Sequence, residues 1–569
     1  MMFQNFVSTI SPLTRLVGIT VFLTACGGGG GGTPGVGGGG NVRTPETVVF
    51  VADKEVDNVR ELYAMQDDGS GLIKLSGSLL SGGVGLFKLS PDKTKVAYLA
   101  MQDTSGVTDL YVANVDGTGM LKVSQGLGPN ADVYHGNTSD AFWWSPDSTR
   151  LVYLADTDID EIQELFLVNA DGSDHHKING NVGTTVKIGQ AQWSPDSRYV
   201  AYFVRSRTPF HSGYAVDRIA INTHDTTIGG PNSVRVSGTA AANRTDWVNQ
   251  FVWSPDSTRI AYTSFENTSG VRELYIAIAG QTTQQSRVNV PLTSGQGVLF
   301  RLYWSEDSRY LLYNITGANP GGLYTHDTQN PTARNGVNIS GSLASGRSIN
   351  RFAFSPDDSR VAYMADQDTD NEIELYSALP GVANSSIRLN GVLPTDGDVT
   401  DFKWSPDSSR VAYVADQDTN DVLEAYTAAA DGGSASIKVS LANLTNSVVQ
   451  HSRFSWSPDG DFIAYEVVSG DETGLYVTTP NDNLSARKVS GNAFTSQSRF
   501  GYQPYVDEYF TYSPWTSDSR YFIFSASINT TSPSPNLPWL LYRVGIDETQ
   551  PTDITGSLVA GGSVGGFDY

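Results

Sequence analysis

Residues 402–414 of this chain read Phe-Lys-Trp-Ser-Pro-Asp-Ser-Ser-Arg-Val-Ala-Tyr-Val, and this stretch decides the fold. Aromatic and β-branched residues on either side of a polar tetrapeptide indicate two short strands. Proline presets the backbone for the second position of a tight turn, and Ser and Asp bond to nearby backbone in turns. The stretch therefore predicts a β-hairpin, with strands at 402–404 and 410–414 and a turn at 405–408.

The same phrase occurs nine times, and its spacing predicts the architecture. Counted from the Ser of each copy, the steps are 55, 49, 60, 51, 50, 50 and 52 residues, with about 60 to the last. Two more predicted strands, at 423–426 and 437–440, complete the unit that begins at residue 402. A period near fifty residues with four short strands fits a β-propeller blade, and no helical pattern is sustained anywhere, so we expect an all-β chain. The copies lie at residues 89–92, 144–147, 193–196, 253–256, 304–307, 354–357, 404–407, 456–459 and 515–518.

The two ends of the repeat array predict how the ring closes. The first unit begins at a second strand, residues 47–51, and the chain ends in Phe567-Asp568-Tyr569, which resembles a first strand. We therefore expect the C-terminal strand to pair with the N-terminal blade, which would hide two sheet edges. Counted in this way, residues 46–569 form a single propeller of about ten four-stranded repeats. The number would be eight or nine if irregular stretches near 205–245 and 497–515 pack outside the ring.

The N-terminal residues 1–26 predict a lipoprotein signal peptide. Leu16 to Ala25 is an apolar run too short to cross a membrane as a helix. It leads into Leu23-Thr24-Ala25-Cys26, which matches the lipobox of bacterial lipoproteins, and Cys26 is the only cysteine. We therefore expect lipid attachment at Cys26.

The residues that follow Cys26 predict a tether and a location. Residues 27–45 are rich in glycine, which is typical of a flexible linker. Gly27, directly after the cysteine, is typical of sorting to the outer membrane of Gram-negative bacteria. We expect a monomer in the cell envelope, held to the membrane through its lipid alone and facing either the periplasm or the cell surface.

The acidic composition argues against two kinds of partner, nucleic acids and anionic lipid surfaces. The formal net charge is −23, from 60 acidic and 37 basic residues. Nucleic acids and anionic lipid surfaces require a basic footprint, so neither is an expected partner. No apolar run after Cys26 is long enough to span a membrane as a helix.

Two acidic loops between the second and third strands are candidate cation sites. Alternating carboxylates resemble the start of a calcium loop, because hard cations prefer clustered oxygen ligands. The positions that should be Gly and Glu are Asn371 or Asp421 and Ser377 or Thr427, which departs from that pattern. Ordinary turn chemistry explains the same residues, so both interpretations stay open. The candidate calcium ligands are Asp366, Asp368, Asp370, Asp416 and Asp418.

The segment 497–515 departs most from the repeat and is a candidate binding region. It is rich in tyrosine and lengthens a connection between two blades, on the same face as the acidic loops. Tyrosine-rich loops form rigid amphipathic contact surfaces, although these rings would also pack over an irregular blade. A second long connection includes Trp247. The candidate binding residues are Arg499, Phe500, Tyr502, Tyr505, Tyr509 and Trp247.

Catalytic signatures are sparse. The seven histidines show no paired metal spacing, and a Gly-x-Ser-x-Gly match at 561–565 has no histidine after it. The Asp of each Ser-Pro-Asp turn and the basic residue that follows, as in Arg150 and Arg259, are expected to brace neighbouring backbone or blades. No catalytic residue is predicted.

The repeats resemble the TolB-type, WD-like β-propeller family. That family's unit has an aromatic residue before Ser-Pro-Asp-Gly, an acidic loop, a Glu-Leu-Tyr strand and an Asp-Gly turn, as in Glu374-Leu375-Tyr376 and Asp171-Gly172 here. The resemblance implies the propeller fold. Two departures limit it: a glycine tether stands where TolB has an α/β domain, and only Gly460 retains the glycine after Ser-Pro-Asp.

These patterns favour a binding or scaffold module for an envelope protein, peptide or glycan. The alternative is a propeller enzyme, a metal-assisted lyase or hydrolase that acts on polysaccharide. Fold alone does not separate the two, because propellers carry many functions.

Overall fold

The structure is a computed structural model that describes residues 43–568 outside a set of gaps. The gaps are residues 57, 81, 127–130, 134–140, 157–162, 180–185, 210–214, 228–229, 239–247, 249, 269, 283, 294, 318–320, 330–333, 345, 442–447, 469–472, 483–484, 492–499, 502–514, 527–539 and 559–562.

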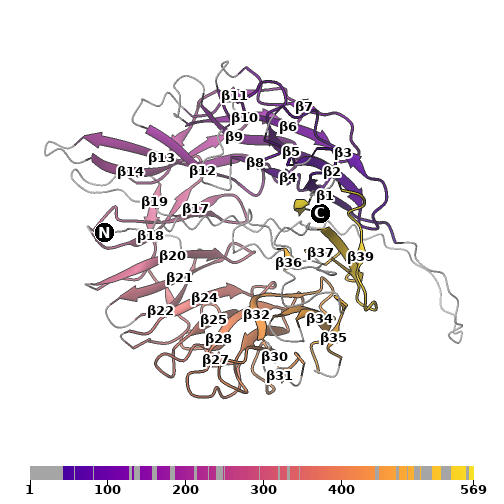
Figure 1. The fold of residues 1–569 in the computed structure, drawn as a ribbon. Helices are drawn as coiled ribbons and strands as arrows, with labels where there is room; N and C mark the ends of the chain where they lie inside the picture. Colours follow the sequence, from indigo (N-terminus) through magenta and orange to yellow (C-terminus); the bar gives the residue numbers. More distant parts are fainter. Residues whose placement is uncertain are drawn as a thin grey trace, which may run out of the picture.

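The described residues form ten four-stranded antiparallel sheets arranged in a ring, with no helix among them (Figure 1). Blade 1 contains β1, β2, β3 and β40, and each later blade contains four consecutive strands, from β4–β7 in blade 2 to β36–β39 in blade 10. We name the strands of a blade a to d from the centre outward. The ten-blade ring confirms the fold predicted from the period, and the smaller counts of eight or nine do not apply.

The strand bounds follow the repeat. Strands a are β4 (Phe87–Leu89), β8 (Phe142–Trp144), β12 (Val186–Trp193), β16 (Phe251–Trp253), β20 (Gln296–Trp304), β24 (Ile349–Phe354), β28 (Val399–Trp404), β32 (Val448–Trp456), β36 (Phe500–Gly501) and β40 (Val564–Asp568). Strands b are β1 (Thr47–Ala52), β5 (Lys95–Ala100), β9 (Arg150–Asp156), β13 (Tyr199–Pro209), β17 (Arg259–Ser264), β21 (Tyr310–Gly317), β25 (Val361–Ala365), β29 (Arg410–Ala415), β33 (Ile463–Val468) and β37 (Tyr521–Ala526). Strands c are β2 (Glu61–Gln66), β6 (Asp109–Asn114), β10 (Gln163–Asn169), β14 (Ala215–Asp225), β18 (Glu273–Ile278), β22 (Gly322–Asp327), β26 (Glu374–Ala378), β30 (Glu424–Ala429), β34 (Gly474–Thr478) and β38 (Leu540–Gly545). Strands d are β3 (Ile73–Lys74), β7 (Leu121–Lys122), β11 (His176–Lys177), β15 (Val234–Arg235), β19 (Gln285–Arg287), β23 (Val337–Asn338), β27 (Ile387–Arg388), β31 (Ile437–Lys438), β35 (Arg487–Lys488) and β39 (Thr552–Asp553).

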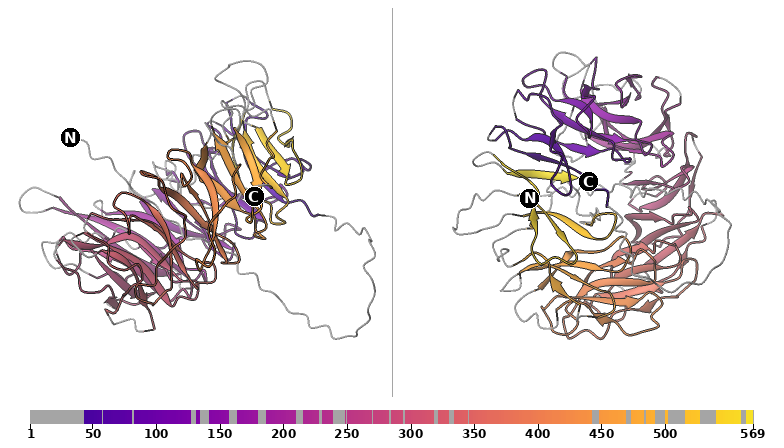
Figure 2. Two further views of the ribbon diagram at one scale, coloured as in Figure 1. Left: turned by 90° about the horizontal axis from the view of Figure 1, so that it is seen from below. Right: turned by 90° about the vertical axis from the view of Figure 1, so that its right-hand side faces the viewer.

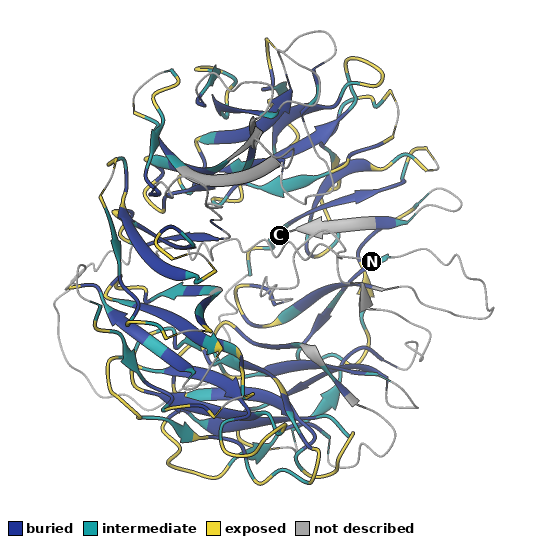
Figure 3. Ribbon diagram, turned by 90° about the vertical axis from the view of Figure 1, so that its left-hand side faces the viewer, coloured by how far each residue is buried: buried dark blue, intermediate teal, exposed yellow. Residues whose placement is uncertain are grey.

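Most of the described residues in strands b and c are buried (Figure 3). Buried clusters span neighbouring blades, as where Met364 of blade 7 packs in one cluster with Phe402 and Tyr413 of blade 8. In blade 8, Phe402 is paired with Tyr413, and the rings of Tyr413 and Tyr426 stack with centroids 5.3 Å apart. The aromatic side chains of strands b and c stack in the same way in eight further blades. The repeated aromatic positions of the sequence are therefore the inter-blade core.

The ring closes as the chain ends predict. Strand β40 pairs antiparallel with β1, with Val49 opposite Asp568 and Ala52 opposite Val564. Figures 1 and 2 show the first and last sheets side by side. The C-terminal strand thus supplies strand a of blade 1.

The described residues of the stretch near 205–245 belong to blade 4 of the ring rather than packing outside it. Strands β13 and β14 are eleven residues each and extend the hairpin of blade 4 beyond the usual length. This longer hairpin accounts for the larger step of the repeat at this point.

Candidate functional site

The propeller has two unlike faces, because successive connections of an antiparallel meander lie at opposite strand ends. The a–b and c–d turns lie on one face, which we call the turn face. The b–c loops and the d–a connections to the next blade lie on the other, which we call the loop face.

On the turn face, the Ser-Pro-Asp phrase closes each a–b turn through its own side chains. In blade 8 the Ser405 hydroxyl donates to Asp407 Oδ1 at 2.6 Å and accepts from the Arg410 backbone N–H at 2.9 Å. Asp407 Oδ1 also accepts from the Ser409 N–H at 3.1 Å. The hydrogen bond from Ser405 is the main cause of a lowered pKa at Asp407, against an opposing effect of burial. These carboxylates serve the turn.

The residue after Ser-Pro-Asp joins neighbouring blades. Ser408 has a φ of 64°, in the left-handed region, and its Oγ accepts a hydrogen bond from the Asp357 N–H of blade 7 at 3.1 Å. The departure from glycine at this position therefore supplies an oxygen that links the blades. Equivalent bonds are accepted by Ser148, Ser197, Ser257, Ser308, Asp358 and Ser519.

We expect Ser408→Ala to lower the free energy of unfolding by about 1 kcal/mol, because the Asp357 N–H loses its acceptor while the left-handed backbone is retained. Ser408→Gly loses the same bond but relieves the backbone, so it should cost less than Ser408→Ala. Urea unfolding of the two variants measures the difference. An alanine variant as stable as the wild type would show that the bond contributes nothing.

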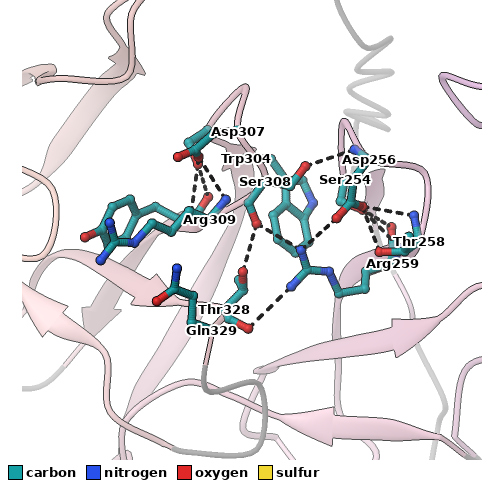
Figure 4. Close-up of polar contacts among 12 residues, drawn as sticks. Ser254, Asp256, Thr258, Arg259, Trp304, Asp307, Ser308, Arg309, Thr328 and Gln329 are labelled. Carbon is teal, nitrogen blue, oxygen red and sulfur yellow. Dashed lines mark hydrogen bonds and ion pairs between the residues drawn. The ribbon is translucent and has the colours of Figure 1, made fainter.

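The tryptophan and arginine side chains of the phrase also connect blades (Figure 4). Trp304 Nε1 donates to the Val252 carbonyl of the preceding blade at 3.3 Å. The guanidinium of Arg259 lies 5.1 Å from the centre of the Trp304 ring and donates to the Ser308 carbonyl at 3.0 Å. The expected bracing is confirmed in two forms. Arg259 reaches the neighbouring blade, whereas aspartates such as Asp407 brace the backbone of their own turns. The indole donors were not anticipated. Equivalent indole bonds come from Trp144, Trp193, Trp253, Trp404 and Trp456.

On the loop face, the first carboxylate of each predicted calcium loop caps backbone groups. Asp366 Oδ1 accepts from the Ser348 N–H at 2.6 Å. Asp416 Oδ1 accepts from the Asp398 N–H at 2.6 Å, and its Oδ2 accepts from the Asp421 N–H at 2.9 Å. Both side chains are buried, which suits a structural role.

Asp398, a residue that the sequence did not single out, links two blades on this face. Its Oδ1 accepts from the Ile373 N–H of blade 7 at 2.7 Å. Burial raises the pKa of Asp398, and the nearby carboxylates of Asp416 and Asp366 raise it further. Asp132 and Asp156 repeat this arrangement in blade 3.

We expect Asp416→Ala to lower the free energy of unfolding by about 2–4 kcal/mol, because two backbone N–H groups lose a charged acceptor. Asp416→Asn keeps one carbonyl oxygen and should cost about half as much. Asp370→Ala, at an exposed position of blade 7, is the control and should change stability by less than about 0.5 kcal/mol. Equal effects of the alanine variants at 416 and 370 would contradict the capping role.

The remaining candidate calcium ligands lie further out on the two loops. Asp368, Asp370 and Asp418 are exposed, and Asp418 lies 3.3 Å from the Lys438 ammonium. Within the part of the chain that the structure describes, no three His, Cys, Asp or Glu residues are grouped so as to hold a metal. Calcium binding stays a prediction.

Beneath these loops, a buried acidic residue begins strand c of several blades and meets a cation from strand d. Glu374 accepts hydrogen bonds from Arg388 at 2.7 Å and from the Tyr376 hydroxyl at 2.6 Å. Glu424 pairs with Lys438 and Tyr426 in blade 8. The Glu-Leu-Tyr motif therefore holds strands c and d together. The sequence could have indicated this pair, because a Lys or Arg stands thirteen or fourteen residues after the acidic residue that begins strand c.

Most of the candidate binding residues lie outside the described residues, namely Arg499, Tyr502, Tyr505, Tyr509 and Trp247. Phe500 is described through its backbone alone, which pairs with Ala526 in β36 of blade 10. Their role in binding stays a prediction. Cys26 also lies outside the described residues. The described residues contain no helix long and apolar enough to span a membrane.

Comparison with known proteins does not show a family. Neither the models of known protein families nor the curated protein sequences contain a match to this chain. Among solved structures, a eukaryotic initiation factor aligns with a TM-score of 0.45 and 12% identity, over 78% of this chain and 96% of the other. A prolyl endopeptidase aligns with a TM-score of 0.34 and 15% sequence identity, over 68% of this chain and 54% of the endopeptidase. TolB from Acinetobacter baumannii aligns with a TM-score of 0.23 and 15% sequence identity, over 50% of this chain and 62% of TolB.

These likenesses are too distant to support a family or a function. The chain spans about half the length of the prolyl endopeptidase that it resembles. The fold is assigned from the ten sheets and the order of their strands. This chain is a ten-bladed β-propeller that is closed by its C-terminal strand.

Proposed function

We propose that this chain is a lipid-anchored propeller of the bacterial cell envelope, of the TolB type in its repeats, that binds a protein, peptide or glycan through its loop face. One observation carries the proposal. Val392, whose residue surface is 79% exposed, lies in the d–a connection between blades 7 and 8, on the same face as the exposed acidic residues 368–371 and 418–421 of these blades. The N–H of the preceding residue, Gly391, donates to Oε1 of Gln417 in the b–c loop of blade 8 at 2.7 Å. No other described large apolar residue is as exposed.

This arrangement has the chemistry of a contact surface. An apolar side chain with a polar rim gains free energy when a partner covers it, and the neighbouring carboxylates favour a cationic partner. On the turn face, the Ser, Asp, Trp and Arg side chains of the repeated phrase are engaged within and between blades. Its described large apolar residues are also less exposed than Val392, reaching at most 48% at Val382. A basic segment of a protein or peptide fits the patch better than an acidic one.

Site-specific photocrosslinking in intact cells tests the proposal. A photoreactive amino acid at Val392 should give discrete adducts, and the same residue at Val382 should give none. Val382 is a matched control, because it is 48% exposed in the same blade but lies in the c–d turn on the turn face. Adducts from position 382 alone, or from neither position, would overturn the loop face as the binding surface.

Lipid attachment and calcium binding have separate tests. Full-length protein should partition into detergent, and Cys26→Ser should remain in the aqueous phase. Metal analysis of the domain from residue 43 onward addresses both the calcium prediction and the alternative of a metal-assisted lyase or hydrolase. A stoichiometric cation, lost in an Asp368→Asn, Asp370→Asn and Asp418→Asn variant, would favour that alternative.

A further inference from the structure

The described chain begins with a residue that is bound across the closing seam of the ring. Arg43 Nη1 donates to Asp67 Oδ1 at 2.9 Å, and its Nε donates to Asp518 Oδ2 at 2.8 Å. Its guanidinium also lies 4.5 Å from the centre of the Tyr521 ring. The Asp67 side chain has no exposed surface, so this contact is buried on one side. Arg43 thus joins blade 1 to blade 10.

Glu46 adds a second link at the same seam. Its carboxylate Oε1 accepts from the Ser517 N–H at 2.7 Å and from the Ser517 hydroxyl at 2.5 Å. Its backbone carbonyl accepts from the Asp67 N–H at 2.8 Å. We call residues 43–46 the clasp.

All partners of the clasp lie on one face. Ser517 and Asp518 belong to the a–b turn of blade 10, and Asp67 belongs to the c–d turn of blade 1. Both turns are on the turn face. Arg43, the first described residue, is therefore held on the turn face, on the side opposite Val392 and the acidic loops.

We propose that the turn face is the membrane-facing side of the anchored protein and that the loop face is presented away from the membrane. This orientation rests on the proposed lipid attachment at Cys26. The 16 residues between Cys26 and the clasp are mostly glycine. A flexible chain of this length has a root-mean-square span of roughly 20–25 Å. A six-residue strand of the propeller is itself about 20 Å long, so presenting the loop face to the membrane would require the tether to pass around the rim.

Charge indicates that the tether, rather than adsorption, holds the turn face near the membrane. Exposed aspartates such as Asp68, Asp116 and Asp171 occupy its c–d turns. Acidic side chains gain nothing from an anionic lipid surface. The turn face is therefore expected to stay near the membrane through the tether alone, approaching the headgroups transiently rather than adsorbing to them.

Fluorescence quenching on vesicles tests the orientation. Because Cys26 is the only cysteine and its thiol would carry the lipid, one introduced cysteine can be labelled alone. Ser70→Cys on the turn face and Val56→Cys on the loop face are matched exposed positions in blade 1. Lipidated full-length protein is labelled at either site and reconstituted into phosphatidylcholine vesicles that contain a headgroup nitroxide lipid.

We expect the label at position 70 to be quenched at least twofold more than the label at position 56. In an Arg43→Ala, Glu46→Ala variant that retains its strand circular dichroism, the difference should shrink while vesicle binding is unchanged. Equal or reversed quenching in vesicle-bound protein would overturn the orientation alone. Protein that does not bind vesicles at all would overturn the lipid anchor, and the orientation with it.

Discussion

Removal of residues 563–569 is expected to lower the free energy of unfolding by on the order of 5 kcal/mol, since strand β40 closes the ring. The deletion removes a four-residue ladder with β1, in which each net backbone hydrogen bond contributes about 0.5–1.5 kcal/mol. It also removes Val564, which is 5% exposed and whose burial contributes about 1.5–3 kcal/mol. Urea unfolding of the domain from residue 43 onward measures the loss.

The same deletion uncovers the edge of β1, so we also expect self-association. An exposed strand edge is a template for pairing with a second chain. Size-exclusion chromatography should show dimers or larger species of the truncated protein. Arg487→Ala is the control, because Arg487 and Asp547 form an exposed ion pair whose loss should cost less than about 1 kcal/mol. A monomeric truncated protein with an unchanged urea midpoint would contradict ring closure by β40.

Acidification from pH 7 to pH 4.5 is expected to destabilise the protein by several kcal/mol through two buried histidines. His224 in β14 and His326 in β22 have no exposed surface, and their ring nitrogens make no hydrogen bond within the described chain. Burial is the main cause that lowers the pKa of each imidazole from 6.5 to about 4. The nearby His176 lowers the pKa of His224 further, while Asp225 raises it. At His326, Asp327 and the nearby Asn335 side chain raise the pKa, and Arg259 lowers it.

The direction in which stability changes with pH follows from proton binding by the folded and unfolded states. Between pH 6.5 and about 4 the unfolded chain binds protons at these histidines and the native state does not. Stability is therefore complete above pH 6.5 and is lost as the pH falls toward 4. The difference between the two pKa values corresponds to about 3 kcal/mol for each imidazole at the low end of this window.

Leucine substitutions isolate the effect. Because the rings make no hydrogen bonds, His224→Leu and His326→Leu should alter stability little at pH 7.5. Urea unfolding at pH 7.5 and 4.5 should show that the double variant loses much less stability than the wild type. Groups whose raised pKa acts in the opposite direction, such as Asp398 and Glu466, are present in both proteins and cancel. Identical pH profiles would contradict the assignment.

Local pattern predicted the elements of the fold well. In blade 8 the strands predicted at 402–404 and 410–414 became β28, which begins three residues earlier, and β29, which ends one residue later. The pairing of the last strand with the first blade also followed from the repeat. The irregular 205–245 stretch was harder to place, since an extended hairpin and an extra unit look alike in one sequence.

The candidate site was predicted less completely. The sequence singled out Asp366 and Asp416 as cation ligands, yet their nearest partners are backbone N–H groups from d–a connections. Val392 carried no signal, because an isolated apolar residue in a loop is ordinary until its exposure is known. Residues 43–45 of the clasp lie within the predicted tether of residues 27–45, and Arg43 meets Asp518 across 475 residues.

By itself, the sequence determined the blade and the strand that closes the ring, because both follow from short-range alternation and a period that one chain displays in full. It left ten, nine or eight blades open, and the sheets of the structure decided for ten. Only the tertiary structure decided how one blade holds the next. The phrase around residue 404 carries Ser408, Trp404 and Arg410, but which side chains cross to a neighbouring blade depends on the curvature of the ring. That curvature brings together atoms about fifty residues apart, and at the seam nearly the whole chain apart, and no local pattern encodes such distances.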